Sequence, residues 1–225
     1  MHSASLQQHI NSSFSKKIVA HPLWSMIAAF GCYFCVYGFR KPFTAGSYEG
    51  IEFFHIGWKS LLISSQILGY LLSKAGGIFF VSSLQANKRT QAILVSIAIA
   101  LISLFFFAIC PAPYSLVFLF INGLPLGMIF GYIQGYLEGK TNSELLIASL
   151  GASFILADGV SKSVGSWLLQ NRIPINWMPF SAGLIYLLPV IFFAILFGFF
   201  ITQIQTEKQL VLNRFFDSMF EVMMK

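Results

Sequence analysis

The stretch FGCYFCVYGFRKPFTAG, from Phe30 to Gly46, decides the fold because it places two adjacent cations, Arg40 and Lys41, in a long apolar and aromatic run. Two interpretations are open. In the first, a helix ends just before the two cations, which lie at the membrane interface and extend their charged ends into water. In the second, the helix continues past them, and Arg40 lies inside the membrane.

The residues upstream favour the second interpretation. His21 and Pro22 indicate that the helix starts near Leu23, since proline prefers the first turn of a helix. A run from Leu23 to Phe39 is short for a membrane span, which needs roughly 20 apolar residues. We therefore expect the span to continue to about Ser47, with a local break at Pro42 inside it.

The whole composition agrees with a lipid environment. The chain has 225 residues, of which 56% are hydrophobic and only 10% are charged, whereas a soluble domain carries about 25% charged residues. The net charge of +6 comes from scattered cations and not from a basic stripe, so nucleic acid is excluded as a partner. The lipid bilayer is the expected surrounding.

Six segments are long and apolar enough to predict an all-α membrane protein with six transmembrane helices. Residues 1–22 are expected to form a cytoplasmic N-terminal tail, residues 23–203 the six-helix bundle, and residues 204–225 a second cytoplasmic tail or a truncated central linker. That last segment mixes charges with Leu, Phe and Met, so it is either an interfacial amphipathic helix or a solvated tail. The predicted spans are about Leu23–Ser47, Trp58–Leu84, Thr90–Cys110, Tyr114–Leu137, Leu145–Gln170 and Phe180–Gln203.

The cations outside these spans predict the orientation. With the N-terminus in the cytoplasm, Lys59 and Arg172 are the two cations on the far side. The positive-inside rule then places both termini in the cytoplasm. We expect the protein to lie in the plasma (inner) membrane. The eight cations on the cytoplasmic side are Lys16, Lys17, Lys88, Arg89, Lys140, Lys208, Arg214 and Lys225.

Charged residues inside the spans are the candidates for function, because each costs roughly 3 kcal/mol or more at membrane depth and usually faces a partner or a water-filled cavity. Lys74 either lines such a cavity or extends to the cytoplasmic interface. Asp158 and Lys162 are four residues apart, which predicts an intramembrane pair on one helix face. We interpret Asp158 as structural and Lys162 as the better candidate for binding.

Together these residues predict a site for a small anion. Arg40, Lys74 and Lys162 would supply positive charge, and the planar guanidinium suits a carboxylate or a phosphate. Tyr37 and Gln66 are placed nearby as smaller polar groups. Tyr33, Asn122 and Gln134 could join the site, although such groups more often bond one helix to another. A row of glycines at four-residue spacing, Gly127, Gly131 and Gly135, predicts close helix packing.

Other chemistries are not favoured. Cys32 and Cys35 form a C-x-x-C without the soluble βαβ context of a redox motif. The sequence has no metal-ligand cluster, no phosphate-binding loop and no implied cofactor. An intramembrane enzyme would need paired carboxylates or a metal cluster, and only Asp158 lies within the spans. We therefore expect no enzymatic activity.

The residues quoted above resemble a known family. FGCYFCVYGFRKPFTAG is similar to the first helix of organophosphate:phosphate antiporters, a branch of the major facilitator superfamily. LISSQILGYLLSKAGGIFFVSSLQANKR resembles their second helix and the loop after it, and NGLPLGMIFGYIQGY has the glycine-rich pattern of the superfamily's fourth helix. The resemblance implies that Arg40 binds the phosphate of the substrate and that Lys74 lines the same cavity.

Two departures from the family limit this resemblance. The acidic position that the superfamily carries in the loop after its second helix is missing from VSSLQANKR. The superfamily also has twelve helices in two halves with the substrate between them, and this chain corresponds to the N-terminal half. A separately encoded second half or a homodimer partner would have to complete the site.

The sequence therefore predicts the N-terminal half of a secondary transporter that moves a small anionic solute, such as a phosphate or an organophosphate, by alternating access. The alternative is a truncated, inactive transporter fragment or a membrane scaffold that does not transport.

Overall fold

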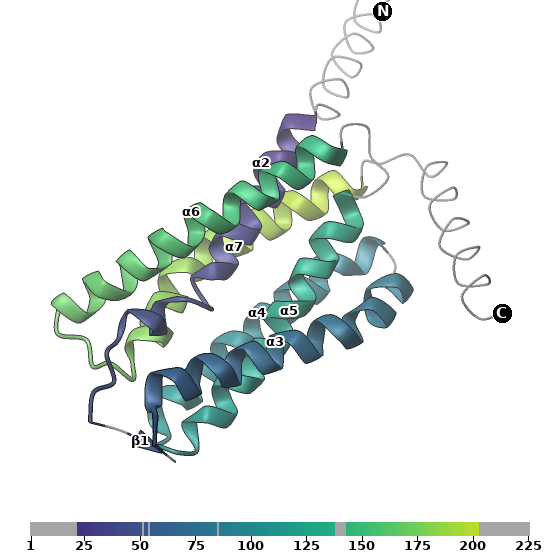
Figure 1. Ribbon diagram of the computed structural model, residues 1–225. Coiled ribbons are helices and arrows are strands. Elements are labelled where there is room, and N and C mark those ends of the chain that lie inside the picture. Colours follow the sequence, from purple (N-terminus) through teal and green to yellow (C-terminus); the bar gives the residue numbers. More distant parts are fainter. Residues whose placement is uncertain (1–21, 51, 54, 85, 138–142, 203–225) are drawn as a thin grey trace, which may run out of the picture.

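The computed structural model describes residues 22–50, 52–53, 55–84, 86–137 and 143–202 (Figure 1). The predicted tails, apart from Pro22, lie outside the described residues, as does the question of an amphipathic C-terminal helix. Six α-helices account for most of the described chain. They are α2 (Pro22–Tyr37), α3 (Trp58–Ser83), α4 (Ala86–Ile109), α5 (Ser115–Leu137), α6 (Ser143–Gln170) and α7 (Met178–Thr202).

Four of these helices contain stretches that are long and apolar enough to cross a membrane. An all-helical fold with membrane-length helices is thus confirmed. In α2 the apolar part is shorter, Met26–Tyr37, and α3 is not among the four. The four stretches are Lys88–Ile109, Ser115–Gln134, Ile147–Gln170 and Met178–Leu196.

The segment predicted as the first span, Leu23–Ser47 with a local break at Pro42, is broken earlier than expected. Helix α2 ends at Tyr37, and a 3-10 helix, η1 (Pro42–Ala45), follows after a turn. The backbone N–H of Arg40 bonds the carbonyl of Tyr37, three residues back, so the last turn tightens before the chain leaves the helix. Pro42 has no N–H to continue the α-helical hydrogen bonds, and in a continued helix its ring would clash with the carbonyl of Gly38, four residues back. The break therefore comes before Arg40, which lies between the two helices.

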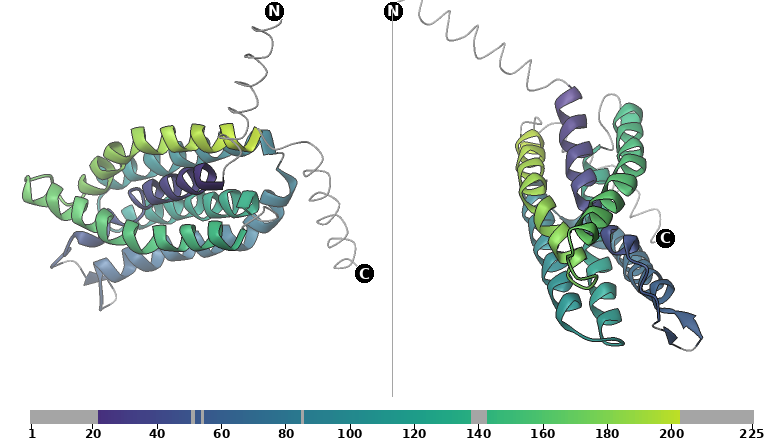
Figure 2. Two further views of the ribbon diagram at one scale, coloured as in Figure 1. Left: turned by 90° about the horizontal axis from the view of Figure 1, so that it is seen from above. Right: turned by 90° about the vertical axis from the view of Figure 1, so that its left-hand side faces the viewer.

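The six helices form two groups of three (Figure 1). In one group α5 packs against α3 and α4, and in the other α2 packs against α6 and α7. Helix α4 packs against α7 and joins the groups. The view from the side separates the same two groups (Figure 2).

The two groups have matching packing patterns. Exchanging α2 with α5, α3 with α6 and α4 with α7 leaves the most extensive helix contacts unchanged: the pair α3–α5 becomes α6–α2, the pair α4–α5 becomes α7–α2, and α4–α7 maps onto itself. Because the exchange shifts each helix by three positions, it also reverses the direction in which the helix runs. The two successive three-helix units therefore share the same pattern of main helix neighbours, with the helix directions reversed.

The contact between α3 and α5 is the most extensive helix contact among the described residues. A Cβ atom added to Gly69 would overlap the carbonyl oxygen of Phe120, and one added to Gly123 would overlap that of Gln66. At Gly127, which the sequence predicted as a packing residue, the added Cβ would lie 2.8 Å from the Tyr70 carbonyl oxygen. These glycines let the two backbones approach directly.

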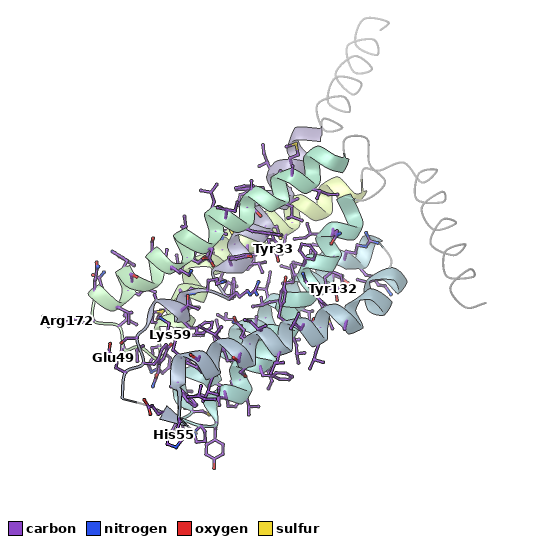
Figure 3. The ribbon with its side chains drawn as sticks, viewed as in Figure 1. Tyr33, Glu49, His55, Lys59, Tyr132 and Arg172 are labelled. Atoms are coloured by element: carbon purple, nitrogen blue, oxygen red, sulfur yellow. The ribbon has the colours of Figure 1, made fainter. Side chains whose placement is uncertain are left out.

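The segment between η1 and α3 lies at the end of the bundle that also carries Arg172 (Figure 3). It contains a short antiparallel pair, β1 (Glu52–Phe53) with β2 (Ile56–Gly57). The Tyr48 side chain turns inward here, and burial raises the pKa of its phenol. Tyr48 therefore stays neutral and anchors the segment by packing.

Candidate functional site

Two of the predicted cations meet on one aromatic ring. The guanidinium carbon of Arg40 lies 4.1 Å from the centroid of the Tyr70 ring, and the ammonium of Lys74 lies 4.9 Å from the same centroid. Lys74 also sits 4.2 Å from the centroid of the Phe130 ring on α5. Such distances are those of cation–π contacts. The ring of Tyr70 on α3 thus brings together two cations that are distant in the sequence.

Neither cation has a carboxylate partner within the described part of the chain, where the ion pairs all involve Asp158. Arg40 is partly exposed and Lys74 is exposed. Aromatic faces hold a cation without neutralising its charge. The pair therefore presents positive charge that is available to an anion.

Further aromatic rings pack next to Arg40 and Tyr70. Tyr33, which Figure 3 shows deep between the helices, is 2% exposed, and its hydroxyl lies 3.2 Å from that of Tyr70. The ring of Tyr37 lies 5.7 Å from the Arg40 guanidinium and stacks on Phe154 of α6 at 6.1 Å. Tyr37 is thus placed where the sequence predicted it, beside Arg40, and it connects α2 to α6.

Gln66 has a different position from the one expected of a ligand group. It is only 3% exposed, and its side-chain amide donates hydrogen bonds to the Arg40 carbonyl at 3.2 Å and to Oδ1 of Asn122 at 2.8 Å. Asn122 in turn donates to the carbonyl of Ala100 at 3.1 Å. Gln66 therefore fixes the backbone at Arg40 and does not bond to its guanidinium.

A second charged group lies on the α6 side. Asp158 forms ion pairs with Lys162 at 2.6 Å and with Lys41 at 2.8 Å. The Asp158–Lys162 pair has the one-turn spacing that the sequence indicated. Lys41 was not considered for the site, although its position next to Arg40 was the available signal. The turn after Tyr37 directs the two neighbouring cations to different partners.

The site residues thus fall into two adjacent clusters. The first, here called the Tyr70 cluster, contains Arg40, Lys74 and Tyr70. The second, here called the Asp158 cluster, contains Lys41, Asp158 and Lys162. The structure brings Arg40 and Lys74 together and places Lys162 in the other cluster. The stacked rings of Tyr37 and Phe154 and the bond between residues 40 and 41 connect the two. Four cations and one carboxylate make the combined site strongly positive.

The described residues hold no cluster of three or more His, Cys, Asp or Glu side chains that could bind a metal ion. Cys32 and Cys35 are free and buried in α2. Their surroundings are packing contacts, in agreement with the interpretation of this C-x-x-C as two small apolar residues.

These features define a helical protein with membrane-length helices and a cationic, aromatic-supported site. The chain belongs to a family of unknown function, DUF5690, whose family model matches residues 42–214. Lys74, Asp158 and Lys162 lie inside the matched range, and Arg40 and Lys41 lie immediately before it. No curated protein and no solved structure matches the chain.

Proposed function

We propose that this protein is a six-helix half of a secondary transporter that binds a small anion, such as a phosphate or an organophosphate, and moves it by alternating access. Arg40 and Lys74 bind the anion, and Tyr37 and Tyr70 hold them in place. The protein is integral to the plasma (inner) membrane, with both termini in the cytoplasm.

The observation that carries this proposal is the pairing of Arg40 and Lys74 on the Tyr70 ring without a carboxylate partner among the described residues. A cation at membrane depth is costly unless it is paired or functional. Two cations that converge from different segments, and that are held by rings and not by counter-ions, are most simply explained by an anion that arrives from outside the protein.

The inverted packing of the two three-helix units supports the transporter class. Inverted repeats are a recurring architecture of secondary transporters, including the halves of major facilitator proteins. The exchange of α2–α4 with α5–α7 is the pattern that such a half would have. A transporter of this class works by rocking one six-helix unit against another, so we propose that a second six-helix unit or a second copy of this chain faces the site.

Substitution of Arg40 tests the binding role. We expect Arg40→Ala to weaken binding of inorganic phosphate or glycerol phosphate by about 100-fold, because a charge-assisted hydrogen bond contributes about 1.5–3 kcal/mol. Isothermal titration calorimetry on the full chain in lipid nanodiscs measures this change. Arg40→Lys should recover part of the affinity, since it keeps the charge but loses the planar fork.

The matched control is Lys59→Ala, which removes a cation at the end of the bundle (Figure 3). It should leave phosphate binding unchanged. If the wild type binds neither anion, or if Arg40→Ala binds both as well as the wild type does, the proposed function is wrong.

A further inference from the structure

The Asp158 cluster is more than a neutralised pair, because one carboxylate holds two ammonium groups. Its two oxygens are divided between them: Oδ1 meets Lys41 and Oδ2 meets Lys162. The side chain of Asp158 is 31% exposed, that of Lys41 29% and that of Lys162 46%. The three side chains are therefore partly exposed, although Oδ1 of Asp158 is itself buried.

The groups that face Asp158 come from three elements. Lys162 is on its own helix, Lys41 comes from the turn before η1, and Tyr37 of α2 stacks on Phe154, one turn before Asp158. Lys41 is directly bonded along the chain to Arg40 of the Tyr70 cluster. Tyr37 interacts electrostatically with both Arg40 and Asp158, so an anion held by Arg40 would add its negative charge close to the Asp158 carboxylate.

Each ammonium group has three donors, so both lysines could also bind an anion. Asp158 competes with that anion for them. It acts as an internal counter-ion that occupies Lys41 and Lys162 while the site is empty.

We propose that Asp158 takes up a proton from solvent when an anion binds at Arg40 and Lys74, so that the protein binds the anion together with H⁺. This inference rests on the proposed anion site and adds the coupling ion to it. The proton goes to the Asp158 carboxylate, both ion pairs are lost, and Lys41 and Lys162 become available to the anion.

Two effects act in the same direction. A bound anion repels the negative carboxylate, and it draws the lysines that had stabilised the carboxylate in its charged form. Both make the protonated form of Asp158 more favourable. By linkage, protonation of Asp158 must then strengthen anion binding by the same factor. Couplings between sites are commonly about 5- to 150-fold, and the contact of Asp158 with two site cations leads us to expect about tenfold.

The test measures how many protons the protein takes up for each anion that it binds. Titration of inorganic phosphate into the full chain in nanodiscs, in buffers of different ionisation enthalpy, gives the number of protons taken up for each anion bound. The same titration with sulfate, whose charge does not change over the range, removes the contribution of the anion itself. We expect the wild type to take up protons on binding below about pH 5 and its affinity for sulfate to rise several-fold as the pH falls from about 6 to about 3, because an ion-paired carboxylate titrates below about pH 5.

Asp158→Asn mimics the protonated carboxylate. It should bind the anion about tenfold more tightly than the wild type at neutral pH, with an affinity for sulfate that no longer depends on pH and with no proton uptake. Asp158→Glu should restore the pH dependence, and Glu49→Gln, at the end of the bundle, should behave as the wild type (Figure 3).

The outcomes separate this inference from the proposed function. If Arg40→Ala abolishes binding but the wild type takes up no proton, Asp158 is a structural pair and only this inference fails. The same conclusion follows if Asp158→Asn keeps the wild-type pH profile. If Arg40→Ala leaves binding intact, the anion site itself is wrong. Should Asp158→Asn fail to fold, the proton count of the wild type still decides.

Discussion

Two regions of the same apolar bundle contain polar side chains: the seam between α3 and α5, and the Asp158 cluster. The two regions differ in how far those side chains are buried. At the seam, the side chains of Gln66 and Asn122 are 3% and 0% exposed and bond to each other and to backbone carbonyls. In the Asp158 cluster, the charged side chains of Lys41, Asp158 and Lys162 are 29–46% exposed. The polar groups at the seam are thus buried and hydrogen-bonded, whereas the charged groups of the Asp158 cluster are ion-paired and partly exposed.

The difference separates structural from functional polarity. Buried neutral groups that are fully hydrogen-bonded specify how two helices meet. Charged groups that stay partly exposed gain little stability from their ion pairs, so stability alone does not explain their presence in an apolar bundle. Four substitutions can break or sharpen this distinction.

The largest effect is expected at the seam. Gly123→Val would force a side chain into the carbonyl of Gln66, and backbone cannot yield as a flexible side chain can. We expect the free energy of unfolding to fall by about 3 kcal/mol or more, as measured by unfolding in mixed detergent micelles. The control is Gly151→Val, since a Cβ at Gly151 meets nothing within 4 Å. Equal stability of the two variants would mean that the seam is not tightly packed.

Removal of the neutral network should have the next largest effect. Asn122→Leu removes a donor from the Ala100 carbonyl and an acceptor from the Gln66 amide, and it leaves both groups buried. We expect a loss of about 2 kcal/mol of stability. Ser163→Ala is the control, because Ser163 is exposed and bonds only a backbone carbonyl in its own helix. A loss no greater than in this control would show that the network does not specify the seam.

A third substitution acts on the Tyr70 cluster. Tyr70→Leu removes the ring that holds Arg40 and Lys74, and a cation–π contact contributes about 0.5–2 kcal/mol. We expect phosphate affinity to fall about tenfold in calorimetry. Tyr70→Phe keeps the ring and should keep most of the affinity, although it loses the contact between the hydroxyls of Tyr33 and Tyr70. A loss that was equal in both variants would assign the effect to the hydroxyl and not to the ring.

Much of the fold could be predicted from the sequence, because helix length and apolarity are local properties. Five of the predicted spans agree with helices α3 to α7 within a few residues. The first predicted span, Leu23–Ser47, includes a break at Pro42, but α2 already ends at Tyr37. The length of a membrane span does not show where the helix ends within it, because that depends on the local backbone.

The site was only partly predictable, because which polar side chains meet depends on how the helices pack. The spacing of Asp158 and Lys162 within one helix is visible in the sequence, and their ion pair follows from it. The meeting of Arg40 with Lys74 depends on the packing of the α2–η1 turn against α3. The burial of Gln66 depends on the glycines that bring α3 and α5 together, and no property of Gln66 itself indicates it.

The smallest effect on stability is expected in the Asp158 cluster. Lys162→Gln removes one of the two ion pairs of Asp158, but Lys41 remains 2.8 Å from the carboxylate, and Lys162 is the most exposed of the three side chains. Exposed ion pairs contribute about 0–1 kcal/mol, so the free energy of unfolding should change by less than about 1 kcal/mol in mixed micelles. Lys41→Gln is the reciprocal control, since it leaves Asp158 with Lys162. If either substitution cost as much as Asn122→Leu, the cluster would be a buried structural element like the seam. A small cost in both variants would instead place the selective value of these charges in what they bind.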